Sequence, residues 1–111
     1  MNSTESNSQV TLSGLEFADR LERLLQLPLD AQSDVDLWTD ACGEVQTWLN
    51  AHAHELPFEM PVHLMFYFHD PDIRAKEPSY KAHQETAVRR IIRQLRGEEL
   101  PDNKRPWWRF W

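Results

Sequence analysis

Histidine and aspartate side chains that could bind a metal ion occur together between residues 63 and 72. His63 and His69 could converge with Asp70 and Asp72 on one divalent cation, which would suit a small metal-dependent enzyme. The paired ligand spacing typical of zinc sites does not accompany them. Packing and hydrogen bonding are the commoner roles for such histidines, so we expect no bound metal and no other cofactor.

Nucleophilic catalysis finds little support in the sequence. Cys42 is the single cysteine, and it falls on the apolar stripe of a predicted helix, where a small buried thiol is the usual finding. Three glycines in 111 residues provide no glycine-rich loop to cradle a phosphate group. We therefore predict a protein that is not an enzyme and has no evident small-molecule ligand.

Three arginines lie together on one face of a predicted helix. Arg89, Arg93 and Arg96 are spaced by three or four residues, opposite the apolar face of that helix, and we call them the arginine ridge. Glu85 stands four residues before Arg89, at the spacing of a helical ion pair. Arginine can contact phosphate, so a nucleic-acid-binding regulator that uses the Arg-rich helix 80–96 is an alternative function.

Charge is divided unevenly along the chain, which has a net charge of −6. Residues 1–73 contain Arg20 and Arg23 against thirteen acids, whereas residues 74–111 contain ten Lys and Arg against five acids. Such a division indicates attraction between two halves of one fold or between two copies. The acids would repel a nucleic acid backbone, so a protein partner is favoured over nucleic acid.

Four large aromatic residues occupy the last five positions and form an aromatic tail. Each such ring can bury about 150–250 Å², so the four present roughly 600–1,000 Å², whereas the largest exposed patch of a typical monomer is about 300–600 Å². We expect the tail to pack on the chain's own helices, with Trp38 and Trp48 as candidate neighbours, or to be buried in a protein interface. The predicted interaction residues are Trp107, Trp108, Arg109, Phe110 and Trp111 of the tail and Arg89, Arg93 and Arg96 of the ridge.

Two amphipathic helices are predicted in the first half of the chain. Ser13 as N-cap and Glu16 three residues later complete a capping box, and Pro28 ends this helix. A second helix should run from Asp34 to His54 with Ser33 as its cap. The buried faces should comprise Phe17, Ala18, Leu21, Leu24 and Leu25 in the first helix, and Trp38, Ala41, Cys42, Val45, Trp48, Leu49 and His52 in the second.

The stretch 58–68 is compatible with two structures. Its side chains alternate at period two, which favours a strand. No second strong strand is present to pair with it, and Pro61 suits the first turn of a helix that is apolar on nearly all sides. We favour a centrally buried helix. The alternative is an α+β fold in which a short strand at 58–68 pairs with the tail or with a second subunit.

Two further helices are predicted in the remainder. Residues 70–72 (Asp-Pro-Asp) form a helix start, with a capping Asp and a Pro at the first helical position. Ser79 should cap a long helix that extends through Arg96 and ends at Gly97. Its buried face should comprise Tyr80, Gln84, Ala87, Val88, Ile91, Ile92 and Leu95.

The sequence thus predicts an all-α fold of four to five helices: one domain over residues 13–111, which includes the tail, after a flexible arm at 1–12. Its core should contain Leu21, Leu24, Trp38, Val45, Leu49, Phe66, Val88, Ile91, Ile92 and Leu95. No apolar run approaches the ~20 residues of a membrane span, and residues 1–9 lack the features of a secretory signal, so we expect a cytoplasmic protein. The predicted role is protein–protein association, with a homodimer as the expected form and the tail as apolar anchor.

Overall fold

The computed structural model describes residues 10–100 of the chain. This part contains five α-helices and a short 3₁₀ turn, without a strand, which confirms the predicted all-α fold. The aromatic tail lies outside the described residues. The elements are α2 (Leu12–Gln26), α3 (Gln32–His52), η1 (Ala53–Glu55), α4 (Val62–His69), α5 (Pro71–Lys76) and α6 (Pro78–Leu95).

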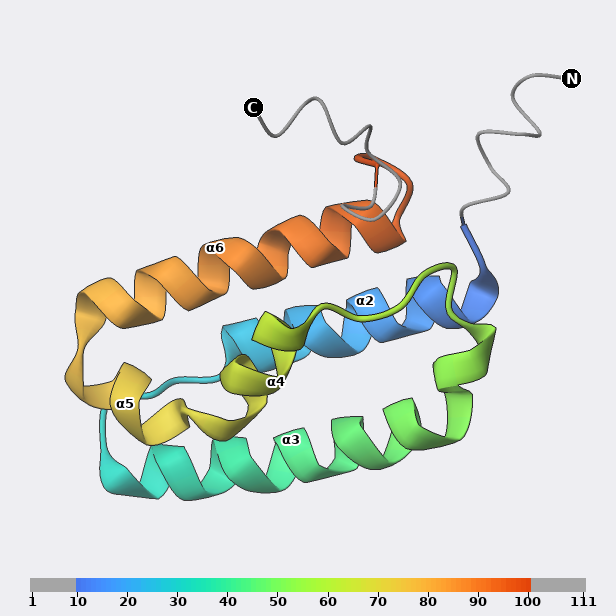
Figure 1. Cartoon of the computed structure of the whole chain (residues 1–111). Helices are drawn as coiled ribbons and strands as arrows, with labels where there is room; N and C mark the ends of the chain where they lie inside the picture. The colour runs from blue at the N-terminus through green and yellow to red at the C-terminus, as the bar shows by residue number, and fades with distance from the viewer. Residues whose placement is uncertain (1–9, 101–111) are drawn as a thin grey trace, which may run out of the picture.

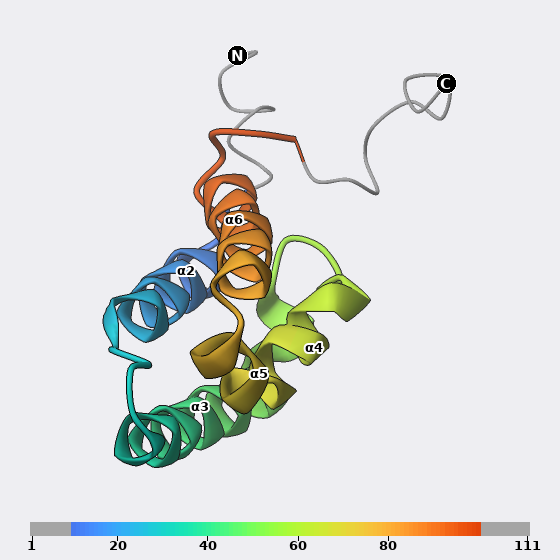
Figure 2. The same ribbon diagram turned by 90° about the vertical axis from the view of Figure 1, so that its left-hand side faces the viewer.

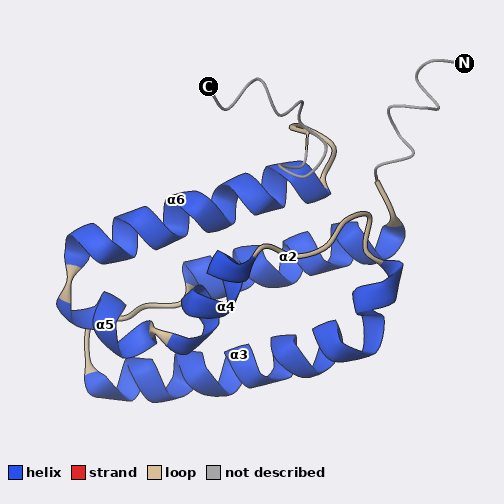
Figure 3. Ribbon diagram, viewed as in Figure 1, coloured by secondary structure: helices blue, strands red, loops and turns tan. Residues whose placement is uncertain are grey.

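The helices surround one core. Helix α2 runs in the opposite direction to α3 and α6, which lie at opposite edges of the molecule (Figure 1). Seen along the helices, α2 fills one side between these edges and the pair α4–α5 fills the other (Figure 2). The links between helices are short, apart from the longer connection from η1 to α4 (Figure 3).

The core confirms most of the predicted buried faces. The apolar stripes of α2, α3 and α6 point inward and leave 8% or less of each of their core side chains exposed. The short helix α4 contributes Leu64, Tyr67 and Phe68 to the same core. The predicted core residues that are buried are Leu21, Leu24, Trp38, Val45, Leu49, Val88, Ile91, Ile92 and Leu95.

The prediction for the stretch 58–68 is right about the helix and wrong about its central burial. Helix α4 covers Val62–His69, but it lies at the side of the bundle (Figure 2) and buries one face only. Phe66, which we predicted in the core, is 56% exposed, and Val62 is 70% exposed. An eight-residue helix that packs from one side cannot bury all of its apolar side chains.

The predicted caps of the first two helices are wrong. The hydroxyl of Thr11 accepts a hydrogen bond from the N–H of Gly14 at 2.9 Å, so α2 begins at Leu12 and not after Ser13. Ser13 instead donates its hydroxyl hydrogen to Glu55, which ties the start of α2 to the 3₁₀ turn after α3.

The second predicted cap, Ser33, lies inside α3 and does not precede it. The carboxylate of Asp34 accepts hydrogen bonds from the N–H groups of Asp30 and Ala31 at 2.9 and 3.0 Å, which fixes the start of α3 at Gln32. Helix α6 also starts one residue before the predicted cap Ser79, because Pro78 occupies its first position. The three errors differ in cause: a neighbouring hydroxyl caps α2, a carboxylate inside the first turn holds the start of α3, and a proline sets the start of α6.

Candidate functional site

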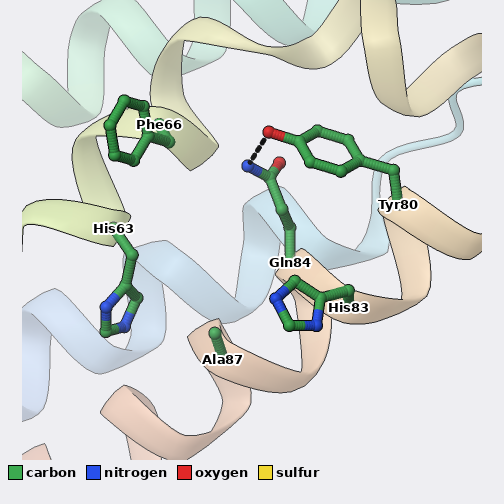
Figure 4. Close-up of a pocket in the computed structure, with 6 residues that line it drawn as sticks. All are labelled: His63, Phe66, Tyr80, His83, Gln84 and Ala87. Carbon is green, nitrogen blue, oxygen red and sulfur yellow. Dashed lines mark hydrogen bonds between the residues drawn. The ribbon is translucent and has the colours of Figure 1, made fainter.

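An open groove runs between α4 and α6. It consists of two adjoining hollows of about 320 Å³ and about 210 Å³ that share His63, His83 and Ala87. Figure 4 shows the larger hollow, which His63 and Phe66 of α4 line opposite four residues of α6. We call the whole depression the α4/α6 groove. Its other lining residues are Tyr80, Gln84, Thr86, Arg90, Ile91, Arg93 and Gln94.

Beside this groove, α4 presents three apolar side chains to the outside. Val62, Met65 and Phe66 are 70%, 39% and 56% exposed and, at spacings of three and four residues, share one face of the helix. We call them the α4 apolar face. Phe66 belongs both to this face and to the groove wall. The groove and the face therefore form one continuous surface of aromatic and aliphatic character.

The groove wall is held in place by a chain of hydrogen bonds. The amide nitrogen of Gln84 donates to the Tyr80 hydroxyl at 2.8 Å, and that hydroxyl donates to the carboxylate of Asp70 at 2.7 Å. The bond to Asp70 raises the pKa of Tyr80. Asp70 precedes α5 as predicted, but its side chain serves this network and makes no capping hydrogen bond.

A buried arginine supports the network from below. Arg74 is 1% exposed, and its guanidinium lies over the rings of Trp38 at 4.5 Å and Tyr67 at 4.2 Å. One nitrogen donates to the Tyr67 carbonyl at 2.6 Å and to the Gln84 side-chain oxygen at 2.7 Å. Nε and Nη2 have no hydrogen-bond partner among the described residues, and burial lowers the pKa of Arg74. No local sequence pattern indicates this role of Arg74, because its partners come from α3, α4 and α6.

A second groove lies on the other side of α6, against α2. Its volume is about 320 Å³, and it brings the three residues of the arginine ridge together, as predicted. Arg96 donates to Asp19 at 2.9 Å and to Glu22 at 2.7 Å, and these bonds raise the pKa of Arg96. We call this depression the α2/α6 groove. Its lining residues are Glu22, Leu25, Gln26, Arg89, Ile92, Arg93 and Arg96.

The other two ridge arginines also contact carboxylates of the same chain. Arg89 lies 3.6 Å from Glu85, the ion pair expected from its spacing, and Arg93 lies 3.3 Å from Glu99. The acidic and basic parts of the sequence thus attract each other, in part, within one fold. The ridge is a partly neutralised surface.

The residues of the metal hypothesis do not form a cluster. His63 lines the α4/α6 groove, and Asp70 accepts a hydrogen bond from Tyr80. Between residues 10 and 100 no group of three or more His, Cys, Asp or Glu side chains is placed to hold a metal ion. Cys42 is buried as predicted, accepts a hydrogen bond from Gln46 at 3.3 Å, and has its thiol pKa raised by burial.

The two tryptophans predicted as neighbours of the tail already have internal partners. Trp38 is 1% exposed and donates its ring N–H to the Leu24 carbonyl at 3.1 Å, so it offers no surface for the tail. Trp48 stacks on Phe17 and on His52, at centroid distances of 5.8 and 4.3 Å. Trp38 is therefore closed to the tail, whereas Trp48 is half-buried and its predicted contact with the tail stays a prediction.

No family model, curated protein or solved structure matches this chain. Within the described part, no helix is both long enough and apolar enough to cross a membrane. The function must therefore be argued from the two grooves and the α4 apolar face alone.

Proposed function

We propose that this chain acts by binding protein, and that its partner at the α4 apolar face is a second copy of itself. The observation that carries the proposal is the exposure of Val62 and Phe66, at 70% and 56%, on a helix whose other face is buried. Contiguous apolar surface next to a groove is typical of protein interaction sites. We assign the chain no catalytic step and no cofactor, and we propose the cytoplasm as its compartment.

The arrangement of the helices supports a symmetric pair. Two-fold dimers are the commonest oligomers, and their interface uses the same patch of both subunits. Helices α6 and α3 lie at opposite edges of the side that carries α4 (Figure 2). A two-fold axis in this side, parallel to the helices, would set α6 of each copy against α3 of the other.

Charge complementarity supports the same pairing. The exposed residues Asp36, Asp40 and Glu44 of α3 follow one another at four-residue spacing, so α3 presents an acidic stripe. Helix α6 presents Arg90 and Arg93 on the groove side. Such contacts across an interface would favour the correct orientation and a fast association rate more than they would increase affinity.

The ion pairs of the arginine ridge favour protein over nucleic acid as the partner. A phosphate that approached Arg96 would have to displace Asp19 and Glu22, both of which lie within 2.9 Å of its guanidinium. The surrounding acids would also repel the remaining phosphates. The α4 side needs no such rearrangement to bind an apolar partner.

The test is the mass of the full chain in solution, measured by light scattering over a concentration series. We expect a mass above the 13.2 kDa of one chain, and a return to that value in the double variant Val62→Glu, Phe66→Glu. Leu12→Glu is the matched control, since Leu12 is 87% exposed on α2, and it should leave the mass unchanged. A wild-type chain that remains a single copy up to about 1 mM would overturn the proposed self-association.

A further inference from the structure

We propose that residues 101–111 of each chain occupy its own α4/α6 groove and place the rings of the aromatic tail beside the α4 apolar face. Two observations support the proposal that residues 101–111 occupy the groove: the course of residues 96–100 and the side chains that line the groove. The benefit to pairing, in which the tail enlarges the apolar surface offered to a second copy, rests on the proposed function.

The described chain turns back on itself immediately after α6. Gly97 has φ of +79°, a conformation that favours glycine, and its N–H donates to the Gln94 carbonyl at 3.2 Å. The N–H of Glu98 donates to the Arg93 carbonyl at 2.8 Å. This pair of bonds is the Schellman termination of a helix, and it reverses the chain direction.

The returning segment is fastened to the end of the groove. Glu99 accepts a hydrogen bond from Arg90 at 2.6 Å and lies 3.3 Å from Arg93. The side chain of Gln94 donates to the Leu100 carbonyl at 3.4 Å. Arg90, Arg93 and Gln94 all line the smaller hollow of the groove. The described part of the chain therefore ends, at Leu100, beside the smaller hollow of the α4/α6 groove.

The distance from this point suits the length of the segment. Along α6 the groove extends from Gln94 to Tyr80, which is roughly 21 Å at 1.5 Å per residue. The seven steps from Leu100 to Trp107 span at most about 23–25 Å in extended form. The tail, residues 107–111, can therefore reach any part of the groove, and its local concentration there is on the order of millimolar.

The groove offers the side chains on which tryptophan already packs in this molecule. Trp48 stacks on His52 at 4.3 Å with an angle of 12° between the rings. His63 and His83 are both exposed and provide two such imidazoles in the groove. Phe66, which belongs to both the groove wall and the α4 apolar face, provides a further ring.

Arginine provides the second type of partner. Arg20 lies 4.9 Å from the Trp48 ring and Arg74 lies 4.5 Å from the Trp38 ring, so both described tryptophans carry a guanidinium. Arg90 and Arg93 line the groove with their charge balanced in part by Glu99. The groove thus offers the three tail tryptophans imidazole and guanidinium groups, the two kinds of partner found around Trp38 and Trp48 in the described fold.

The test uses ¹⁹F NMR of the full chain labelled with 5-fluorotryptophan, with signals assigned by single Trp→Phe variants. Ala87→Arg fills the middle of the groove, and Ala82→Arg places the same side chain on an exposed site of the same helix. We expect Ala87→Arg to shift the signals of Trp107, Trp108 and Trp111, and Ala82→Arg to leave them in place. Tail signals that coincide in the wild type and both variants would overturn the proposal.

Two further measurements keep the result unambiguous. The signals of Trp38 and Trp48 report whether Ala87→Arg has kept its fold, and His83→Ala, at an exposed side chain, should shift the tail signals without touching the core. Dilution from about 1 mM to about 10 μM separates the occupants. Tail signals that do not change on dilution support binding of the tail in the groove of its own chain. Tail signals that revert on dilution to those of Ala87→Arg would show that the tail binds a second copy, and this result would overturn the proposal.

The outcome is independent of self-association. If Val62→Glu, Met65→Glu, which changes no residue of the groove wall, yields single chains in which Ala87→Arg still shifts the tail signals, the occupancy stands. If the wild type pairs but Ala87→Arg shifts nothing, the proposed function stands and the occupancy fails.

Discussion

Helix α6 has a groove on each side, and the two grooves differ in chemistry. The α2/α6 groove and the larger hollow of the α4/α6 groove have the same volume, about 320 Å³. The first is bordered by Arg89, Arg93 and Arg96, all of which contact carboxylates of the chain. The second is bordered by imidazole and phenyl groups and adjoins the exposed α4 apolar face.

This difference shows which of the two surfaces would gain more free energy when a partner covers it. The ion pairs at the α2/α6 groove are partly exposed. They are solvated as they stand, so covering them with a partner would add little free energy. Exposed apolar area gains roughly 25 cal/mol for each Å² removed from water, so covering α4 is favourable whatever the partner. The arginine ridge, which is the most prominent charged pattern in the sequence, therefore has its ion-pair partners within the same chain.

The largest expected effect on stability concerns the support of the α4/α6 groove. Arg74→Ala removes the hydrogen bonds to Tyr67 and Gln84 and leaves a cavity beneath the Trp38 ring. We expect a loss of about 3–5 kcal/mol in the free energy of unfolding, measured with urea.

Arg74→Met is the matched variant, because it keeps the length of the side chain and removes the buried charge. Arg74→Met should lower the free energy of unfolding by at most about 1.5 kcal/mol. Two of the guanidinium nitrogens have no hydrogen-bond partner among residues 10–100, so their removal breaks no hydrogen bond there. Equal losses in the Met and Ala variants would show that the guanidinium itself, and not its volume, supports the groove.

A smaller effect is expected for a single truncation on the α4 apolar face. Phe66→Ala removes a ring that is 56% exposed and should weaken pairing by about tenfold, which is about 1.4 kcal/mol. The folded chain should keep its helical circular dichroism, because Phe66 makes no core contact comparable to that of Leu64. Sedimentation equilibrium gives the dissociation constant, and an unchanged constant would place the contact elsewhere.

Next in size is the cap of α2. Thr11→Ala should cost about 1 kcal/mol because the N–H of Gly14 loses its acceptor. Ser13→Ala, at the position that the sequence pattern favours, should cost less, since its bond to Glu55 is exposed. A larger loss for Ser13→Ala, measured by thermal unfolding, would contradict the observed cap.

The smallest effect is expected at the α2/α6 groove. Arg96→Gln breaks the contacts with Asp19 and Glu22, whose side chains are 60% and 47% exposed, so the loss should be about 0.5 kcal/mol and should shrink in high salt. A loss as large as that of Arg74→Ala would show that this groove, too, is an essential part of the fold.

The elements of the fold could be predicted because each long helix carries its own signal. The apolar stripes of α2, α3 and α6 repeat at helical spacing, and those stripes became the core. Helix α4 gave a weaker signal, since an eight-residue segment that is apolar all round does not show which face packs inward. Phe66 was therefore predicted to be buried, whereas its exposure is now the main evidence for a binding surface.

The buried arginine could not be predicted from local patterns. Arg74 looks like any basic residue near the end of a short helix, and only the tertiary structure brings Trp38, Tyr67 and Gln84 around it. The arginine ridge was predicted correctly as a set, since spacing alone brings it together. The partners of Arg96, Asp19 and Glu22, are more than seventy positions away in the sequence, and no helical pattern can indicate such a contact.

We propose that the chain binds its partner on the α4 side of α6 and not on the side of the arginine ridge. The direct measurement is the light-scattering mass of Val62→Glu, Phe66→Glu beside that of Arg89→Glu, Arg96→Gln, whose two arginines line the α2/α6 groove only, with both compared to the wild type. We predict a single chain of 13.2 kDa for the first variant and the wild-type mass for the second. A ridge variant that dissociates while the α4 variant stays associated would contradict the claim.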